Sequence, residues 1–378
     1  MWQAQSGLNW RAAILLGLLS STFSTAVSQL TAARVGRDAI VDWMVVANIP
    51  LRDPALQIEP SAAVIAVGIL FHQWADFSWE VTAFGLFGRW TAALRPWTIL
   101  LLAVPWAIFT SAAEWFVLVP LLPFRQPVFP LEQPYWIGLL VHLSSASMYP
   151  LFPWIRDWLA ARPIPANRRF AAVWGGLAAT GLLGLSAVAL LGWRGHELPW
   201  MGRNLTSDQA FMRRMATHHA QGIELARIAT TRAADPHLRA LSRLMAAEQT
   251  GENRIFGQWW QSWFALPMGG CTSDDRAQMP GMLEPAKIEA LRQQGNHGDP
   301  AFDTQFVQLM TRHHRGAVSM ADAELHGAGD IRLRVMAQAI RHGQQGEIEL
   351  MRGTAGLAAV RAATLDQVEA RLLPKPGP

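Results

Sequence analysis

The chain has 378 residues, of which 51% are hydrophobic and only 16% are charged, a balance typical of a membrane protein with two or three domains. Its formal charge of +4 comes mostly from arginines dispersed in short loops and on amphipathic helices. This pattern lacks basic runs interleaved with aromatic residues and therefore excludes nucleic acid as a partner. The single cysteine, Cys271, excludes a disulfide framework, a zinc ribbon and a CxxC redox site within one chain.

The apolar residues are concentrated before about residue 195. A weakly apolar stretch at residues 12–33 is either a signal sequence, cleaved or retained, or a first transmembrane helix. Four clearer stretches follow, and each is long enough to cross about 30 Å of hydrocarbon as a helix: residues 61–87, 97–122, 135–155 and 170–193. We therefore expect residues 1–195 to form a multi-pass transmembrane domain of four or five helices in the lipid bilayer.

Arginine placement predicts the orientation of these spans. The connections that hold Arg89 and Arg95, and the arginines at 156–169, are expected to face the cytoplasm, because cytoplasmic loops are enriched in basic residues. The connection at 124–134 has only Arg125. Residues after 195 are then extracytoplasmic, in a bacterial inner membrane, although three arginines in segment 34–60 count against this orientation.

Beyond residue 196 the apolar pattern changes to a period of 3.6, interrupted by Gly and Pro. It predicts four helices, joined in the middle by a connection rich in Gly, Met, Pro and Asp: residues 207–232, 236–264, 302–326 and 330–353. Four helices with one long crossover form a bundle. The expected fold class is therefore all-α, with a bundle domain at 205–353 and a tail at 354–378 that includes a short helix at 364–373.

This bundle segment contains an internal duplication at an offset of 95 positions. Residues of the first repeat match residues of the second without a gap: Asp208, Met215, His218, His219, Asp235, Gln249 and Glu252 match Asp303, Met310, His313, His314, Asp330, Gln344 and Glu347. The repeated unit is a helical hairpin. We expect approximate twofold symmetry, with corresponding helices facing each other.

Helical spacing collects the chemically active side chains of the second repeat on two faces. On the helix predicted at 302–326, one face carries the imidazoles and thioethers of Met310, His313, His314 and Met320. On the helix predicted at 330–353, one face carries Gln344, Glu347 and Met351. The first repeat has Leu225 and Phe256 at the positions of Met320 and Met351. The second repeat is therefore the richer in metal ligands.

Imidazole and thioether groups together favour copper, and thioethers favour Cu(I) or Ag(I) over hard ions. Glu252 and Glu347 are expected to act as ligands or to orient imidazole N–H groups from behind. A methionine at helical spacing is more often core packing than a ligand. Adjacent histidine pairs repeated in register are different, because burying four imidazoles is costly unless they find partners. They indicate a metal site or catalysis.

These motifs resemble a bacterial family catalogued as domain of unknown function 305. The resemblance covers about residues 205–352. It includes both segments that contain a His-His pair (211–219 and 306–314), the Met279-Pro-Gly-Met282 connection, and residues 344–351 at the end of the last predicted helix. It implies a ferritin-like fold, export, and binding of copper or silver in copper resistance. The family's metal residues carry over onto Met215, His218, His219, Met310, His313, His314, Met320 and Met351. Leu225 and Phe256 depart from the family's methionines, and the membrane half resembles no family that we name.

Ionisable residues also lie within the predicted spans. His72, Asp76 and Glu80 are spaced by four and share a helix face, and Glu114 and His142 lie on the next two spans. They either line a polar path for ions or protons, bind a metal or haem, or pair structurally. We take His72, Glu114 and His142 as candidates for a functional role.

The leading hypothesis is a membrane-anchored extracytoplasmic protein that binds copper or silver for sequestration, resistance or delivery, without turnover. A metal-dependent membrane oxidoreductase is the first alternative, but neither HH motif is preceded by Glu at the Glu-x-x-His spacing of di-iron bundles. The second alternative is an ion or metal transporter with an accessory metal-binding domain. Besides metal ions, the expected partners are a second copy of the chain or a periplasmic metal carrier.

Overall fold

The computed structural model describes residues 2–162, 167–264, 266–294, 298–327 and 329–372. No strand occurs in these ranges, and helices make up most of them, which confirms the all-α class. The chain contacts form two compact units. Unit 1 comprises Met1–Thr31, Ile69–Val117 and Tyr135–Ala187, and unit 2 comprises Ala32–Gly68, Leu118–Pro134 and Val188–Pro378.

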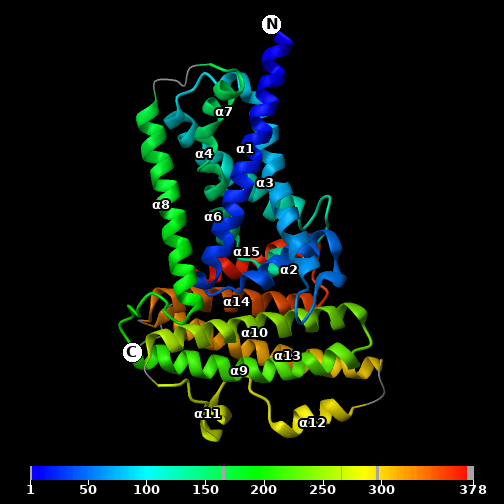
Figure 1. The fold of residues 1–378 in the computed structure, drawn as a ribbon. Helices are drawn as coiled ribbons and strands as arrows, with labels where there is room; N and C mark the ends of the chain where they lie inside the picture. The colour runs from blue at the N-terminus through cyan, green and yellow to red at the C-terminus, as the bar shows by residue number, and fades with distance from the viewer. Residues whose placement is uncertain (1, 163–166, 265, 295–297, 328, 373–378) are drawn as a thin grey trace. The chain divides into compact units, whose positions relative to one another are not determined.

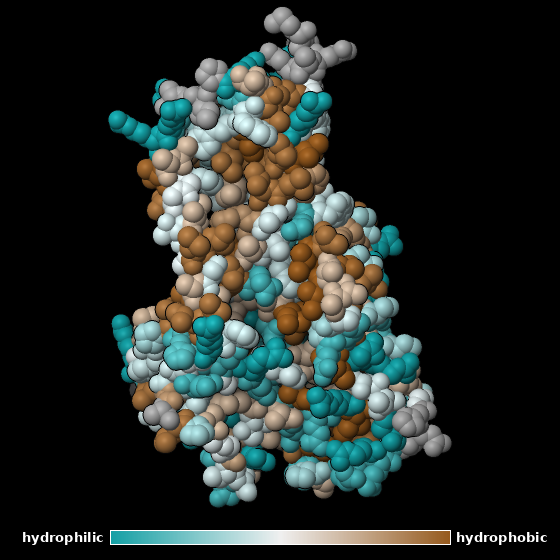
Figure 2. Space-filling model, viewed as in Figure 1, coloured by the Kyte–Doolittle hydropathy of each residue, from teal (hydrophilic) through white to brown (hydrophobic). Residues whose placement is uncertain are grey.

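The helices of unit 1 are mostly apolar (Figure 1): α1 (Trp2–Thr31), α3 (Ala62–Thr91), α4 (Pro96–Ala113), α6 (Tyr135–Ala146), α7 (Phe152–Leu159) and α8 (Arg168–Trp193). Helix α3 begins and α8 ends in segments that belong to unit 2. A π-helical turn (Glu114–Leu118) follows α4. The core of the unit includes Leu16, Phe84 and Phe152, all of which are buried. Figure 2 shows hydrophobic side chains on the surface of this unit as well, and Phe109 and Leu183 are among the exposed ones.

Three helical segments are long and apolar enough to cross a membrane: Gly7–Val35, Pro96–Leu118 and Arg168–Trp193. The other two expected spans differ from these. The stretch at 135–155 is interrupted after α6 by a 3₁₀ turn (Tyr149–Leu151), because Pro150 and Pro153 cannot donate the N–H bonds that would continue a helix. Helix α3 is long, but Asp76 and Glu80 reduce its apolar character.

Unit 2 contains the four-helix bundle, and its helices agree with the expected ones to within two residues at each end: α9 (Leu205–Arg232), α10 (Pro236–Trp263), α13 (Pro300–His326) and α14 (Ile331–Met351). Helices α9 and α10 form one hairpin and α13 and α14 the other, and α9 packs against α13 and α10 against α14 (Figure 1). Phe256, Trp259 and Met336 lie in its apolar core.

The repeated aspartates hold the two hairpins together. Asp235 and Asp330 cap the starts of α10 and α14 by accepting hydrogen bonds from main-chain N–H groups two residues later. Asp303 of the second hairpin accepts the N–H groups of Ala234 and Asp235, at 2.8 Å each. Asp208 of the first hairpin accepts the N–H of Asp330 at 2.9 Å. Each repeat thus caps the helix start of the other.

Several helices of unit 2 were not predicted: α2 (Ala39–Leu51), α5 (Val128–Glu132), α11 (Ser273–Gln278) and α12 (Pro285–Gln293). The predicted tail contains α15 (Gly356–Leu372), which begins well before the expected helix at 364–373; the last residue of that expectation lies outside the described residues. Segments 32–68 and 118–134, which we assigned to the membrane domain, form their contacts with the bundle unit. Helix α5 packs against α14 and α15.

Candidate metal centre

The four repeated imidazoles lie together in the interior of the bundle. His218 and His219 come from the middle of α9, His313 and His314 from the middle of α13, and all four side chains are completely buried. The rings of His218 and His313 face each other across the two helices, with centroids 3.8 Å apart and planes inclined by 38°. The duplicated motifs therefore converge, as twofold symmetry requires.

The connection at Met279–Met282 covers these imidazoles. Gly281 has φ of +79°, and a Cβ there would lie 2.8 Å from the main-chain oxygens of Arg312 and His313, so only glycine fits. The main-chain oxygen of Pro280 accepts a hydrogen bond from Nε2 of His218 at 3.2 Å. Gln221 fixes the end of the connection by bonding to both the N–H and the oxygen of Leu283.

Oxygen atoms lie beside three of the four imidazoles. Since the carbonyl of Pro280 can only accept, Nε2 of neutral His218 carries the proton and Nδ1 keeps a free lone pair. Nε2 of His219 lies 2.8 Å from Oε2 of Glu252, and Nε2 of His314 lies 2.7 Å from Oε2 of Glu347. These two contacts have hydrogen-bond length, yet the atoms are not aligned as donor and acceptor. The Nδ1 atoms of all three rings are buried without a hydrogen-bond partner among the described residues.

Three of the buried imidazoles, those of His218, His313 and His314, are neutral at physiological pH. Burial, and then the neighbouring imidazoles, lower the pKa of His218 to about 3 and that of His314 to about 3. The same causes hold the pKa of His313 well below its usual value. A neutral imidazole is the form that binds a metal, so no proton has to be displaced when a cation arrives.

The methionines lie at different distances from these rings along their helices. Met215 and Met310 are completely buried one turn before the histidine pairs. Met215 belongs to the apolar cluster that contains Phe256, and the half-buried Met320 packs against that cluster. Met320 lies six residues beyond His314, roughly 9 Å along the helix axis. Half-buried Met351 ends α14, one turn beyond Glu347.

A second polar cluster in unit 2 was not predicted. One carboxylate oxygen from each of Glu132, Glu248 and Glu347 lies within 4.8 Å of the other two. Among the described residues, no other three His, Cys, Asp or Glu side chains bring their ligand atoms this close together. Burial, and then the neighbouring carboxylates, raise the pKa of Glu132 and Glu347 well above the usual range. Burial raises the pKa of Glu248 to about 7. Only Glu347 carried a signal in the sequence, because Glu248 has no counterpart in the second repeat and Glu132 lies outside both.

The candidate residues of unit 1 are paired. His142 shares a contact of 3.2 Å with Glu114 through Nε2 and one of 3.0 Å with Thr110 through Nδ1, and Trp79 donates to Glu114. His72 lies 3.8 Å from Asp76. These contacts account for the burial of His72, Glu114 and His142, and a functional role for them stays a prediction.

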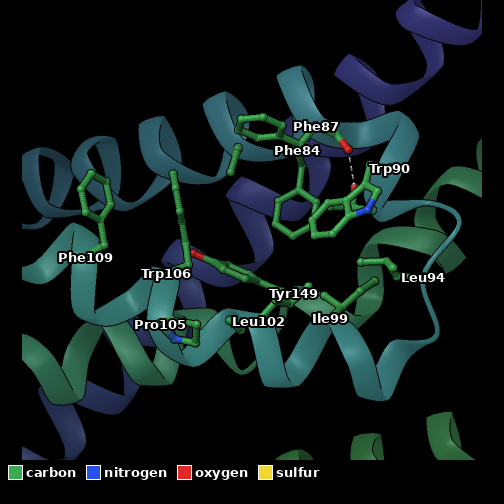
Figure 3. A pocket seen from close by; sticks show the side chains of 13 residues that line it. Phe84, Phe87, Trp90, Leu94, Ile99, Leu102, Pro105, Trp106, Phe109 and Tyr149 are labelled. Atoms are coloured by element: carbon green, nitrogen blue, oxygen red, sulfur yellow. Dashed lines mark hydrogen bonds between the residues drawn. The ribbon is translucent and has the colours of Figure 1, made fainter.

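Unit 1 also contains an apolar pocket of about 500 Å³. Figure 3 shows its aromatic lining, with Phe84, Phe87 and Trp90 from α3, Trp106 and Phe109 from α4, and Tyr149 from the 3₁₀ turn. None of the predicted site residues lines it.

Comparison with known proteins concerns the bundle. A family model described as Domain of unknown function (DUF305) matches residues 208–355, whereas no family model recognises the membrane region. A DUF305 fragment from Deinococcus radiodurans is 28% identical, with 41% of this chain and 97% of that chain covered and a TM-score of 0.36.

A DUF305 protein from Streptomyces coelicolor is 31% identical over 38% of this chain and 88% of that chain, with a TM-score of 0.34. CopM in a silver-bound form is 27% identical over 39% of this chain and 93% of that chain, with a TM-score of 0.32. None of the curated proteins compared with the chain matches it.

Proposed function

Because residues 208–355 belong to the DUF305 family, we propose that this chain is a membrane-anchored protein whose bundle binds Cu(I) or Ag(I). The bound ion is sequestered or passed on, without chemical turnover. The observation that carries the proposal is the burial of four imidazoles whose lone pairs have no partner. His218, His313 and His314 are neutral, and Nδ1 of each is buried without a hydrogen bond.

An unpaired buried nitrogen costs free energy that a bound cation recovers. Such a cost repeated at four adjacent rings is hard to explain by packing alone. Glu252 and Glu347 each place an oxygen beside Nε2 of a ring, which is how carboxylates orient metal-bound imidazoles. On this basis His219 and His314 bind through Nδ1, and the glutamates support them from behind.

The geometry favours a soft monovalent ion over Zn(II). Structural zinc sites use four nitrogen, sulfur or oxygen ligands in a tetrahedron. No three imidazole or carboxylate ligand atoms around these four rings lie within 4.8 Å of one another in the described residues. Cu(I) and Ag(I) prefer soft ligands such as thioethers. We assign Met215 and Met310, one turn from the imidazoles, as the nearest thioether ligands, with Met320 and Met351 as outer ones.

The membrane anchor is supported by the three long apolar segments and by the exposed leucines and aromatic residues on their surfaces. With the arginine-rich connections in the cytoplasm, the chain after α8 enters the extracytoplasmic space. The bundle would then meet metal ions outside the cell.

The test is a competition titration of the full chain in detergent with a chromogenic Cu(I) chelator. We expect tighter binding of Cu(I) than of Zn(II), and loss of most Cu(I) binding when His313 and His314 are both replaced by Ala. The same change at His218 and His219 should weaken binding less, because Leu225 and Phe256 stand where the second repeat has methionines. Replacement of the exposed His196 by Ala is the matched control. Undiminished Cu(I) binding by the His313→Ala, His314→Ala variant would refute the proposal.

A further inference from the structure

Three carboxylates from three helices meet inside unit 2. Glu132 ends α5, Glu248 lies on α10 and Glu347 on α14, and one oxygen of each lies within 4.8 Å of the other two. Glu132 is 0% exposed and Glu347 1% exposed, so water does not screen their charges. Such an arrangement repels itself unless a cation or protons compensate it.

Glycines on α14 allow Glu132 to reach the bundle. A Cβ at Gly346 would collide with the main-chain oxygen of Leu131, so only glycine lets α5 lie directly on α14. A Cβ at Gly343 would lie 3.3 Å from Oε2 of Glu132. Nε2 of His342 holds α5 in place through a contact of 3.1 Å with the main-chain oxygen of Pro130. The approach of Glu132 is thus fixed by the local packing.

Two of the three carboxylates lack hydrogen-bond partners outside the cluster. Both oxygens of Glu132 and both of Glu347 are buried, and no other described residue donates a hydrogen bond to them. His314 adds a second kind of unpaired group, since its Nε2 is fully buried and lies 2.7 Å from Oε2 of Glu347 without the alignment of a hydrogen bond. Unpaired oxygen atoms from α5, α10 and α14 therefore lie in one interior region, beside a buried imidazole nitrogen.

The neighbouring arginine does not neutralise the cluster. Arg37 lies 3.9 Å from Oε1 of Glu248, but its Nε and Nη2 both donate to Oδ1 of Asp42, at 2.9 and 2.7 Å. The single charge of Arg37 is thus shared with Asp42, so it cannot neutralise three ionised glutamates. A cavity of about 10 Å³ beside Arg37 and Glu248 has room for one water molecule.

We propose that Glu132, Glu248 and Glu347 bind one hard divalent cation of the Mn²⁺ class. Carboxylate oxygens select Mg²⁺, Ca²⁺ and Mn²⁺ rather than Cu(I) or Ag(I). The site adjoins the imidazole cluster through Glu347, which contacts His314, but its other two ligands, Glu132 and Glu248, belong to the carboxylate cluster alone. It is complete only when α5, from outside residues 208–355, lies on α14. The cation therefore links the segment at 118–134 to the bundle within unit 2.

Mn²⁺ is the probe, because the electron paramagnetic resonance signal of the free aqueous ion falls as it binds. We expect the metal-free full chain in detergent to bind one Mn²⁺, and Glu132→Gln to weaken binding roughly 10–100-fold. Glu248→Gln is a second variant with the same expected effect. Both substitutions preserve side-chain volume and place a neutral amide where a buried carboxyl group stood, so neither requires the helices to repack. Glu59→Gln, at an exposed carboxylate in unit 2, is the control.

Absence of Mn²⁺ binding by the unmodified chain, or equal binding by Glu132→Gln and Glu248→Gln, would overturn this proposal and show that protons compensate the carboxylates. The result is separable from the copper test. Glu132→Gln should retain Cu(I) binding, and the His313→Ala, His314→Ala variant should retain Mn²⁺ binding. A chain that binds Cu(I) but not Mn²⁺ would refute only the carboxylate site, and one that binds Mn²⁺ but not Cu(I) would refute only the copper site.

Discussion

A shared proton at one end of the bundle makes its stability depend on pH. Oε1 of Glu324 and Oδ1 of Asp208 are both buried without another partner, and a Cβ added to Gly329 would touch both atoms. Burial, and then the charge of Asp208, raise the pKa of Glu324 to about 8. The protonated Glu324 can donate to Asp208, whose other oxygen accepts the N–H of Asp330 at the start of α14.

The sign and size of the effect follow from linkage. An ordinary glutamate in the unfolded chain has a pKa near 4.3, so between pH 4.3 and about 8 the folded state holds one more proton than the unfolded state. The stabilisation is complete below the unfolded pKa and is lost as pH rises through the folded one. Each pH unit in this window costs about 1.4 kcal/mol, or about 3 kcal/mol from pH 5.5 to 7.5. For a unit of this size that corresponds to roughly 5–10 °C in Tm.

The substitution Glu324→Gln isolates this contribution, because the amide can still donate to Asp208 but does not titrate. We expect the Tm of the variant relative to the unmodified chain to rise by roughly 5–10 °C between pH 5.5 and 7.5. The measurement is thermal unfolding of the full chain in nonionic detergent, followed by near-ultraviolet circular dichroism. Glu284→Gln, at an exposed carboxylate, should show no such trend. A constant difference between Glu324→Gln and the unmodified chain at both pH values would refute the shared proton.

Two further predictions concern the repeats. Leu225→Met restores a thioether that the first repeat lacks, so we expect tighter Cu(I) binding or a second bound ion in the chelator titration. Because the two side chains are similar in volume, the substitution should lower the free energy of unfolding by less than about 1.5 kcal/mol. Unchanged stoichiometry and affinity would argue against thioether ligation. Gly346→Ala brings a methyl group into the main-chain oxygen of Leu131 and should lower the free energy of unfolding by about 1–3 kcal/mol in thermal melts. Gly257→Ala, on a helix with open space around its Cβ, should be neutral or stabilising, so equal effects of the two substitutions would contradict the proposed contact.

The sequence predicted the bundle well because its signals are local. The period of the apolar residues, the capping aspartates and the 95-residue offset place α9, α10, α13 and α14 without knowledge of any distant contact. The convergence of His218 and His313 followed from the same offset, because equivalent helices of a twofold bundle meet in its middle.

The carboxylate cluster could not be predicted in this way, because it depends on contacts between segments far apart in the chain. Glu132 ends a five-residue helix with no periodicity, and it reaches Glu347 only because Gly346 admits α5. Hydropathy likewise gave no sign that segments 32–68 and 118–134 pack with the bundle. Pro150 and Pro153 did indicate that the helix expected at 135–155 is interrupted, because prolines lack the N–H groups that continue a helix. The prediction missed this because it relied on hydropathy alone.

The duplicated Gly-Glu pairs, at 251–252 and 346–347, connect the outer segments of unit 2 to the metal centre. A Cβ at Gly251 would lie 2.7 Å from Cβ of Asp38, and Gly346 meets Leu131 in the same way, so each repeat uses its glycine to admit a different outer segment. The next residue in each repeat, Glu252 or Glu347, contacts an imidazole of the metal centre. A displacement of either outer segment would therefore act on the helix turn that orients His219 or His314. The two repeats thus differ in the segment that packs beside each glutamate, as well as in the methionines that the first repeat lacks.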